Sequence, residues 1–220
     1  DAYARAHFTG DFETDIITVN PYMGFDTLTP FTKYMTFSKG AKGAFILLCT
    51  SNPGMKDIEH QELKDGKLIL NKVGDEIARL NKEFLSEYAE QTCGPFGAVV
   101  GATQEQDARI LRDLYPETFF LIPGYGAQGG DAKIAATLLD KAGGTVNSSR
   151  GILCAWKKDS SLDSKREEGT LSLDDIATSA AKAGLGAPDS ADVKVEIVEM
   201  PKKGFLGLGS KPAQVKVSYD

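Results

Sequence analysis

Short apolar runs alternate with amphipathic segments over roughly the first two thirds of the chain. Five runs predict strands, and most of them are close to continuous in apolar residues, as strands buried on both faces should be: Asp15–Asn20, Gly43–Thr50, Gly97–Thr103, Phe119–Gly124 and Thr145–Ser149. Helical periodicity follows each of the first four, in Phe25–Phe37, Val73–Thr92, Gln104–Leu114 and Asp131–Ala142. This alternation predicts a parallel sheet with right-handed crossovers.

Two further segments belong to this first region. The opening residues, Asp1–Phe8, have the pattern of the middle of a helix. Natural chains seldom begin there, so we expect further sequence to precede Asp1. Leu63–Val73, with Asp65-Gly66 as a turn, predicts a hairpin-like insertion after the second strand.

The pattern changes after about Lys158. The stretch Asp159–Gly169 is polar and charged, which predicts a linker. We therefore divide the chain into residues 1–158, a linker of residues 159–169, and a small α+β domain of residues 170–220.

The small domain has its own pattern. Ser172–Ala183 predicts a short amphipathic helix, with Ser172 as the cap and Asp175 completing a capping box. Two alternating strands follow, Val193–Met200 and Ala213–Tyr219. We expect them to pair antiparallel, because the loop between them suits a hairpin and not a helical crossover.

Polar or glycine-rich sequence follows every predicted strand of the first region. Both (β/α)₈ barrels and doubly wound sheets bind ligands at the carboxyl ends of their strands, so spacing alone leaves both folds open. Two of these loops suit phosphate. Gly124–Asp131 is glycine-rich and precedes a helix, and Arg150 follows the last strand. Taken singly, each also fits an ordinary turn with a helix cap or a surface arginine.

Composition and charge narrow the function classes. The chain has 220 residues, of which 41% are hydrophobic and 25% charged, as in ordinary globular proteins of one or two domains. Its net charge of −6 gives no bulk reason for nucleic-acid binding. The sequence has no apolar run of about 18 residues, so we expect no membrane span and no signal peptide.

Cysteine and histidine residues show no metal-binding spacing. The three cysteines are scattered, and Cys49, at the end of an apolar run, is typical of a small buried hydrophobe. Free thiols fit a reducing cytosol. We interpret the two histidines, His7 and His60, as structural or surface residues, and we expect no metal site.

Four linked motifs, in order and with suitable spacing, resemble the orotidine 5′-phosphate decarboxylase family in its bacterial form with longer loops. They are Asn20-Pro21-Tyr22-Met23-Gly24, Thr50-Ser51-Asn52-Pro53-Gly54, Pro123-Gly124-Tyr125-Gly126-Ala127-Gln128-Gly129-Gly130 and Asn147-Ser148-Ser149-Arg150-Gly151. The resemblance covers roughly residues 1–158. It implies a (β/α)₈ barrel, of which this chain would carry the later strands only.

The resemblance also implies a function. The family decarboxylates orotidine 5′-monophosphate to uridine 5′-monophosphate in pyrimidine biosynthesis, without a metal or an organic cofactor. It implies a cytoplasmic homodimer. Six positions match the family's substrate-binding residues: Asn20, Ser51, Pro123, Gln128, Ser149 and Arg150.

Each position carries an implied role. Gln128 and Arg150 match side chains that bind the substrate phosphate, with the backbone at Ser149 assisting. Ser51 matches a serine that hydrogen-bonds the pyrimidine, and Pro123 a proline that walls the base. Without the resemblance, Ser51 would be interpreted as an ordinary turn residue. Asn20 is included only as a motif residue near a strand end.

The family's catalytic lysine and aspartates belong to an Asp-x-Lys-x-x-Asp motif, which the resemblance places before Asp1. Asp-x-Lys spacing occurs at several places, among them Asp65, Asp131 and Asp163, but no second aspartate follows at the required place. We therefore expect no catalytic residue of this reaction in the chain. The alternatives are a non-catalytic phosphate-binding fragment with an RNA-associated interaction domain, or another phosphate-binding barrel enzyme.

The tail has a separate resemblance. Its loop Lys202-Lys203-Gly204-Phe205-Leu206-Gly207-Leu208-Gly209, between the two alternating strands, is similar to the small N-terminal domain of the Jag family of RNA-associated proteins. This resemblance covers about the last fifty residues and implies an RNA-associated partner.

Overall fold

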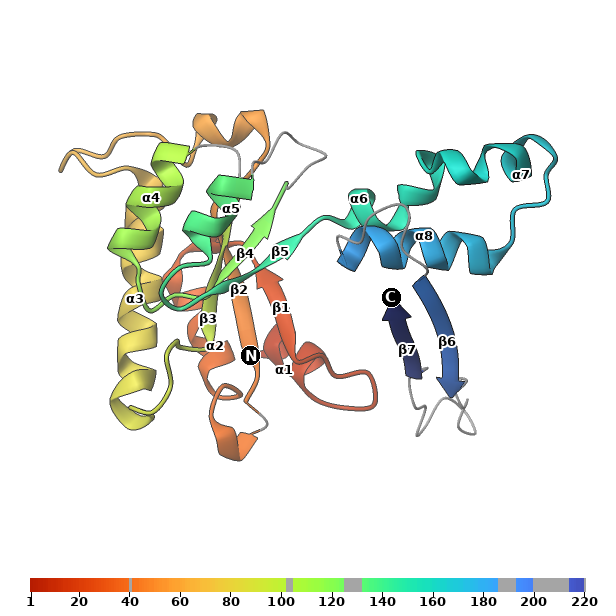
Figure 1. Cartoon of the computed structure of the whole chain (residues 1–220). Helices are drawn as coiled ribbons and strands as arrows, with labels where there is room; N and C mark the ends of the chain where they lie inside the picture. The colour runs from red at the N-terminus through yellow and green to blue at the C-terminus, as the bar shows by residue number, and fades with distance from the viewer. Residues whose placement is uncertain (40, 102–104, 125–131, 186–192, 200–213, 220) are drawn as a thin grey trace. The chain divides into compact units, whose positions relative to one another are not determined.

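The computed structural model describes residues 1–39, 41–101, 105–124, 132–185, 193–199 and 214–219 (Figure 1). The chain divides into two compact units, Asp1–Asn147 and Ser148–Asp220. Within the described part of the chain, no helix is both long enough and apolar enough to cross a membrane.

A parallel five-stranded sheet forms the centre of the first unit. Its strands follow one another across the sheet in chain order, as β1 (Ile16–Val19), β2 (Gly43–Cys49), β3 (Phe96–Val100), β4 (Phe120–Pro123) and β5 (Gly144–Asn147). A doubly wound sheet would reverse direction part-way, whereas an arc of a barrel keeps adding strands on one side. The strand order therefore indicates a partial (β/α)₈ barrel, and all five predicted strands are confirmed.

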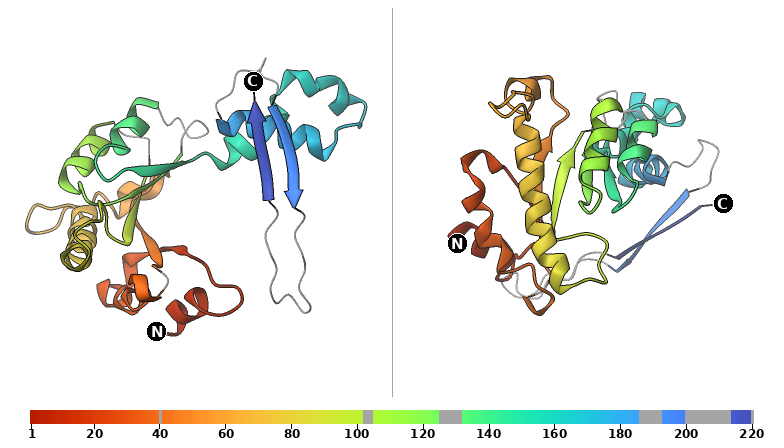
Figure 2. Two further views of the ribbon diagram at one scale, coloured as in Figure 1. Left: turned by 60° about the horizontal axis from the view of Figure 1, so that its bottom comes forward. Right: turned by 90° about the vertical axis from the view of Figure 1, so that its left-hand side faces the viewer.

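Helices α3 (Ile69–Glu87), α4 (Glu105–Leu114) and α5 (Ala132–Leu138) lie on one face of this sheet (Figures 1 and 2). Their apolar sides pack on the strands, with Ile77 and Leu111 almost fully buried. The opening helix, α1 (Ala2–Phe8), is confirmed and buries Ala4 and Phe8. Helices on one face leave the other for the interior of a barrel.

The predicted helix Phe25–Phe37 is wrong. The segment forms three short pieces, η2 (Phe25–Thr27), α2 (Thr29–Thr32) and η3 (Phe37–Lys39). Pro30 lies in the first turn of α2, where its missing N–H is harmless. A helix that ran through it from residue 25 would lose a hydrogen bond there, so the chain starts a new helix instead.

The predicted hairpin Leu63–Val73 is also wrong, although its turn forms. Gly66 takes a φ of 80°, but only a single bridge joins Glu62 to Leu68. Helix α3 then begins at Ile69, earlier than predicted, because Leu70, Val73 and Ile77 recur at helical spacing and are buried on one side.

Two predicted helix ends lie too far along the chain. Helix α3 ends at Glu87 and not at Thr92, and α5 ends at Leu138 and not at Ala142. After α5, Lys141 has a φ of 63° and Gly143 a φ of 78°. These left-handed conformations turn the chain into β5.

Buried polar side chains secure the amino ends of the strands. Lys42, only 4% exposed, lies before β2 and pairs with Asp15 at 3.1 Å and Glu13 at 3.3 Å, both before β1. Asn81 of α3 donates to the carbonyl of Phe96 at 2.8 Å and accepts from its N–H at 3.0 Å. Asn81 therefore joins α3 to the first residue of β3.

Arg112 holds the amino ends of β4 and β5 in the same way. It is fully buried and donates to four backbone carbonyls, those of Tyr115, Thr118, Leu138 and Gly143. Its guanidinium also lies 3.7 Å from the ring centre of Phe120, the first residue of β4. Burial lowers the pKa of Arg112 to about 10, so it remains charged at neutral pH.

The second unit begins earlier than the predicted boundary after residue 158. It contains α6 (Ser149–Leu153), η5 (Ala155–Lys157), η6 (Ser160–Leu162), α7 (Asp163–Glu167), α8 (Leu173–Leu185) and the strands β6 (Val193–Glu199) and β7 (Gln214–Tyr219). The segment predicted as a linker, residues 159–169, therefore holds η6 and α7, with Leu162 buried.

The predicted capping box and hairpin of this unit are confirmed. The backbone N–H of Asp175 donates to the Ser172 hydroxyl at 3.1 Å, and that of Ser172 donates to the Asp175 carboxylate at 3.0 Å. Strands β6 and β7 pair antiparallel, in a register that aligns Val195 with Val217. Helix α8 packs against β6.

Candidate functional site

The carboxyl edge of the sheet gathers the predicted site residues of the first unit. Asn20 follows β1, Ser51 follows β2 closely, and Pro123 is the last residue of β4. In a parallel sheet these ends share one edge. Pro123 is paired with Asn147 of β5, so the last strand ends at the same level.

The loop after β1 is held by Asn20 itself. Its side-chain oxygen accepts the backbone N–H of Tyr22 at 2.9 Å and caps the turn η1 (Pro21–Met23). Tyr22 and Met23 are 78% and 79% exposed. The contact that the structure gives for Asn20 is thus a local one that shapes this exposed loop.

The loop after β2 is fixed by Glu59. Thr50 donates its backbone N–H at 2.8 Å and its hydroxyl at 2.6 Å to the two carboxylate oxygens of Glu59. The hydroxyl also lies 2.8 Å from the side-chain oxygen of Asn52. Because Ser51 lies between these two anchored residues, its backbone position is well defined.

The end of β3 approaches this loop closely. A Cβ at Gly101 would lie 2.8 Å from the Cβ of Ser51, which is too short for real atoms. The N–H of Gly101 donates to the carbonyl of Cys49 at 2.7 Å. Only glycine at this position allows the backbone after β3 to lie this close to Ser51.

A cavity of about 770 Å³ lies between the ends of β1 and β2 and the start of α3. Its lining is mostly apolar, and its polar groups come from Asn20, Thr50, Asn52, Glu59 and Lys72. Neither Ser51 nor Pro123 lines it. The cavity therefore shares Asn20 with the predicted substrate site but does not include Ser51 or Pro123.

The predicted phosphate ligands lie elsewhere in the chain. Gln128 falls outside the described residues. Ser149 and Arg150 are exposed and belong to the second unit. They were predicted in a loop, which is wrong, because both lie in the short helix α6. The chain order nevertheless puts them directly after β5, whose last residue is Asn147.

The two histidines differ in their surroundings. His7 stacks edge-on against Tyr3 of the same helix, with ring centres 4.6 Å apart, as a structural residue would. His60 lies beyond η4 (Pro53–Asp57), and its Nε2 atom is buried without a hydrogen-bond partner. Burial raises the pKa of the nearby Cys49 thiol to about 12, and the charges of Glu59 and Asp107 add to this effect. No local pattern indicated that Cys49, His60 and Asp107 lie close together, because they are far apart in the chain.

Comparison with known families divides the chain in two. The model of the orotidine 5′-phosphate decarboxylase / HUMPS family matches residues 1–162. The model of the Jag N-terminus matches residues 174–219. Both matches agree with the motifs that the sequence contains.

Curated relatives give the same result at high identity. An orotidine 5′-phosphate decarboxylase of Clostridium botulinum is 55% identical over 159 residues, 71% of this chain and 53% of the relative. One of Clostridium novyi is 48% identical over 161 residues, 72% of this chain and 54% of the relative. The chain spans about half the length of the curated relatives that it matches.

Solved structures share the fold of the first unit. The OMP decarboxylase of Leishmania donovani has a TM-score of 0.51 and 29% identity, over 69% of this chain and 53% of that one. The UMP synthase of the same organism has a TM-score of 0.54 and 33% identity, over 69% of this chain and 31% of that one. These likenesses support the partial barrel that the strand order indicates.

Proposed function

Residues 1–162 belong to the orotidine 5′-phosphate decarboxylase / HUMPS family, and on that premise we propose that the chain supplies substrate-binding elements for the decarboxylation of orotidine 5′-monophosphate to uridine 5′-monophosphate. The observation that carries this proposal is the position of the family motifs. Those that the structure describes lie at the carboxyl edge of the sheet or directly after its last strand. Barrel enzymes bind their substrates at that edge.

Each residue has a distinct task in this proposal. The Ser51 hydroxyl hydrogen-bonds the pyrimidine, and Glu59 holds its loop through Thr50. Pro123 forms a rigid apolar wall beside the base. Arg150 and Gln128 bind the phosphate, with the backbone at Ser149 assisting. A guanidinium suits this task because its planar fork can donate two hydrogen bonds to phosphate at once.

Titration of uridine 5′-monophosphate into the full chain tests the proposal. We expect Arg150→Ala to weaken binding about tenfold or more, since a hydrogen bond to a charged group is worth about 1.5–3 kcal/mol. Arg79→Ala is the matched control, because Arg79 is exposed on α3 and its partners among the described residues are Glu76 and Glu83 of the same helix. Equal affinity of the two variants would remove Arg150 from the site.

Two further parts of the proposal concern the protein's context. The family resemblance supports a homodimer in the cytoplasm. The family boundaries also support a decarboxylase-like part of residues 1–158 and a Jag-like part of residues 170–220. Sedimentation of the purified chain tests the dimer, and limited proteolysis near residue 165 tests the division.

A second candidate function concerns the tail alone. The match of residues 174–219 to the Jag N-terminus favours an interaction module with an RNA-associated partner. Anisotropy of a labelled single-stranded RNA, measured with the full chain and with Lys194→Glu, tests direct RNA contact. If both proteins bind the RNA equally weakly, direct RNA contact is excluded, and the proposed partner is an RNA-associated protein.

A further inference from the structure

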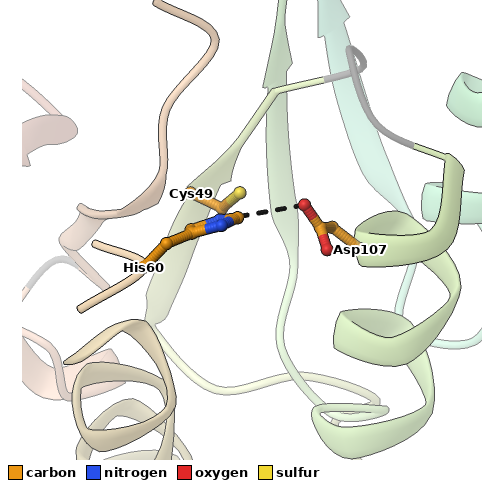
Figure 3. Close-up of side chains that lie close together, drawn as sticks. All are labelled: Cys49, His60 and Asp107. Carbon is orange, nitrogen blue, oxygen red and sulfur yellow. Dashed lines mark ion pairs between the residues drawn. The ribbon is translucent and has the colours of Figure 1, made fainter. Parts of the chain in front are cut away.

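Three side chains of metal-ligand type converge beside the carboxyl end of β2. Cys49 is the last residue of β2, His60 lies between η4 and α3, and Asp107 lies near the start of α4 (Figure 3). One sulfur, one nitrogen and one oxygen atom from these residues all lie within 4.8 Å of one another. Among the described residues, these three form the one group of Cys, His, Asp or Glu side chains close enough to share a metal ion.

One ring nitrogen of His60 is buried without the hydrogen bond that a buried polar atom usually makes. Its Nε2 atom is buried without a hydrogen-bond partner, and the Asp107 carboxylate oxygen lies 3.8 Å away. That distance is too long for a hydrogen bond. It is close to the edge of a zinc tetrahedron, which is roughly 3.3–3.5 Å for bonds of about 2.0–2.1 Å to nitrogen and oxygen.

The local charge favours a cation at this place. The sulfur of Cys49 is buried, with the negative charges of the Glu59 and Asp107 carboxylates close to it. Glu59 already accepts two hydrogen bonds from Thr50. It therefore contributes negative charge and not a ligand atom, which leaves Cys49, His60 and Asp107 as the donor set.

Access and exchange also fit a bound ion. Cys49 is buried, whereas the side chains of His60 and Asp107 are 22% and 33% exposed. An ion can thus reach the site from solvent while its sulfur ligand remains protected. The mixture of one sulfur, one imidazole nitrogen and one carboxylate oxygen is a donor set of zinc, with a fourth position for water.

We propose that Cys49, His60 and Asp107 bind a thiophilic divalent cation of the Zn²⁺ class. The ion joins the end of β2, the segment before α3, and α4. This inference rests on the geometry of the three side chains and does not depend on the proposed nucleotide function. On binding, the thiol proton is released to solvent, and the thiolate becomes the sulfur ligand.

Titration of Zn²⁺ alone into the full chain, in competition with a chromogenic chelator, tests the site. We expect one equivalent to bind, and Cys49→Ser and His60→Ala each to weaken binding at least tenfold. The matched controls are Cys93→Ser and His7→Ala, which remove the same ligand types elsewhere and should leave the affinity unchanged. Binding that is absent, or that Cys49→Ser leaves unchanged, would overturn the proposal.

Co²⁺ reports the sulfur ligand directly. The wild-type chain and Cys93→Ser should both show thiolate-to-cobalt charge-transfer absorption, and Cys49→Ser should not. Asp107→Asn serves as a second variant in case Cys49→Ser fails to fold, because Asp107 is partly exposed and asparagine has nearly its shape. It should keep the sulfur band and weaken the affinity; an unchanged affinity would remove Asp107 from the site and contradict the three-ligand proposal.

Discussion

The two edges of the parallel sheet are built in opposite ways. At the amino edge, buried polar side chains hold the start of each strand: Lys42, Asn81 and Arg112 are at most 4% exposed, and all have hydrogen-bond or ion-pair partners. At the carboxyl edge, Tyr22 is largely exposed and a cavity opens beside β1 and β2. This difference indicates that the amino edge stabilises the fold and the carboxyl edge forms the binding site, as in (β/α)₈ barrels generally.

We expect the carboxyl edge of this chain to bind the nucleotide but not to catalyse its decarboxylation. Of the predicted effects, this loss of activity is the largest. The 220 residues contain no Asp-x-Lys-x-x-Asp motif, so no lysine is identified to protonate the pyrimidine carbon as carbon dioxide leaves. We expect no measurable loss of orotidine 5′-monophosphate absorbance with the chain alone. Turnover comparable to that of a relative would show that the catalytic groups have been misassigned.

Arg112 should give the largest effect on stability. Arg112→Leu removes the side-chain donor of four backbone carbonyls, of which those of Tyr115 and Gly143 keep a backbone N–H donor. We expect the free energy of unfolding to fall by about 3–5 kcal/mol. Urea unfolding measures the change. Arg79→Leu, at an exposed position, should change it by less than about 0.5 kcal/mol. A similar small loss for both variants would refute the assignment of stability to the amino edge.

Ser51 should show the reverse behaviour. Ser51→Ala removes one neutral hydrogen bond to the base, worth about 0.5–1.5 kcal/mol, so uridine 5′-monophosphate should bind about twofold to tenfold more weakly. The melting temperature should remain that of the wild type, because Thr50 and Glu59 still hold the loop. A lower melting temperature with unchanged affinity would make Ser51 a structural residue.

The smallest effect concerns the second unit and acid. Hydrogen bonds from Lys165 and Ser172 lower the pKa of Asp175 from 3.8 to about 2. The stabilisation by this carboxylate is therefore complete above about pH 4 and is lost as the pH falls toward 2. In Asp175→Asn, the melting temperature should therefore depend less on pH between about pH 4 and pH 2. An identical curve for the wild type and the variant would show that the contacts of Asp175 with Lys165 and Ser172 are not formed in solution.

The sequence predicted β2, β3 and β4 well because these strands are largely buried and nearly continuous in apolar residues, a local signal. The outer strands β1 and β5 form as predicted but are partly exposed and not buried on both faces. The sequence did not predict where helices break or begin. The apolar pattern of residues 25–37 continues across Pro30, where the chain starts a new helix. Leu70 and Val73 were assigned to a hairpin, although their spacing also fits the helix that they form. The capping box was predictable because its two members are three residues apart.

Other features depend on contacts that no local pattern contains. Arg112 binds carbonyls as far away as Gly143, and any arginine in an amphipathic helix has the same local signature. Likewise, Cys49 meets Asp107 only because β2 and β3 are neighbours and α4 follows β3. The motifs at the strand ends indicated the candidate substrate residues only through their family resemblance, and Ser51 alone would pass for a turn residue.

Amide hydrogen exchange with and without uridine 5′-monophosphate tests the contrast between the two edges most directly. If the carboxyl edge is the nucleotide site, residues 20–24, 50–54 and 147–151 should exchange more slowly when the nucleotide is bound. Residues 93–96 and 140–144, at the amino edge, should exchange at the same rate in both states. Slower exchange at the amino edge, or no change at the carboxyl edge, would contradict the account.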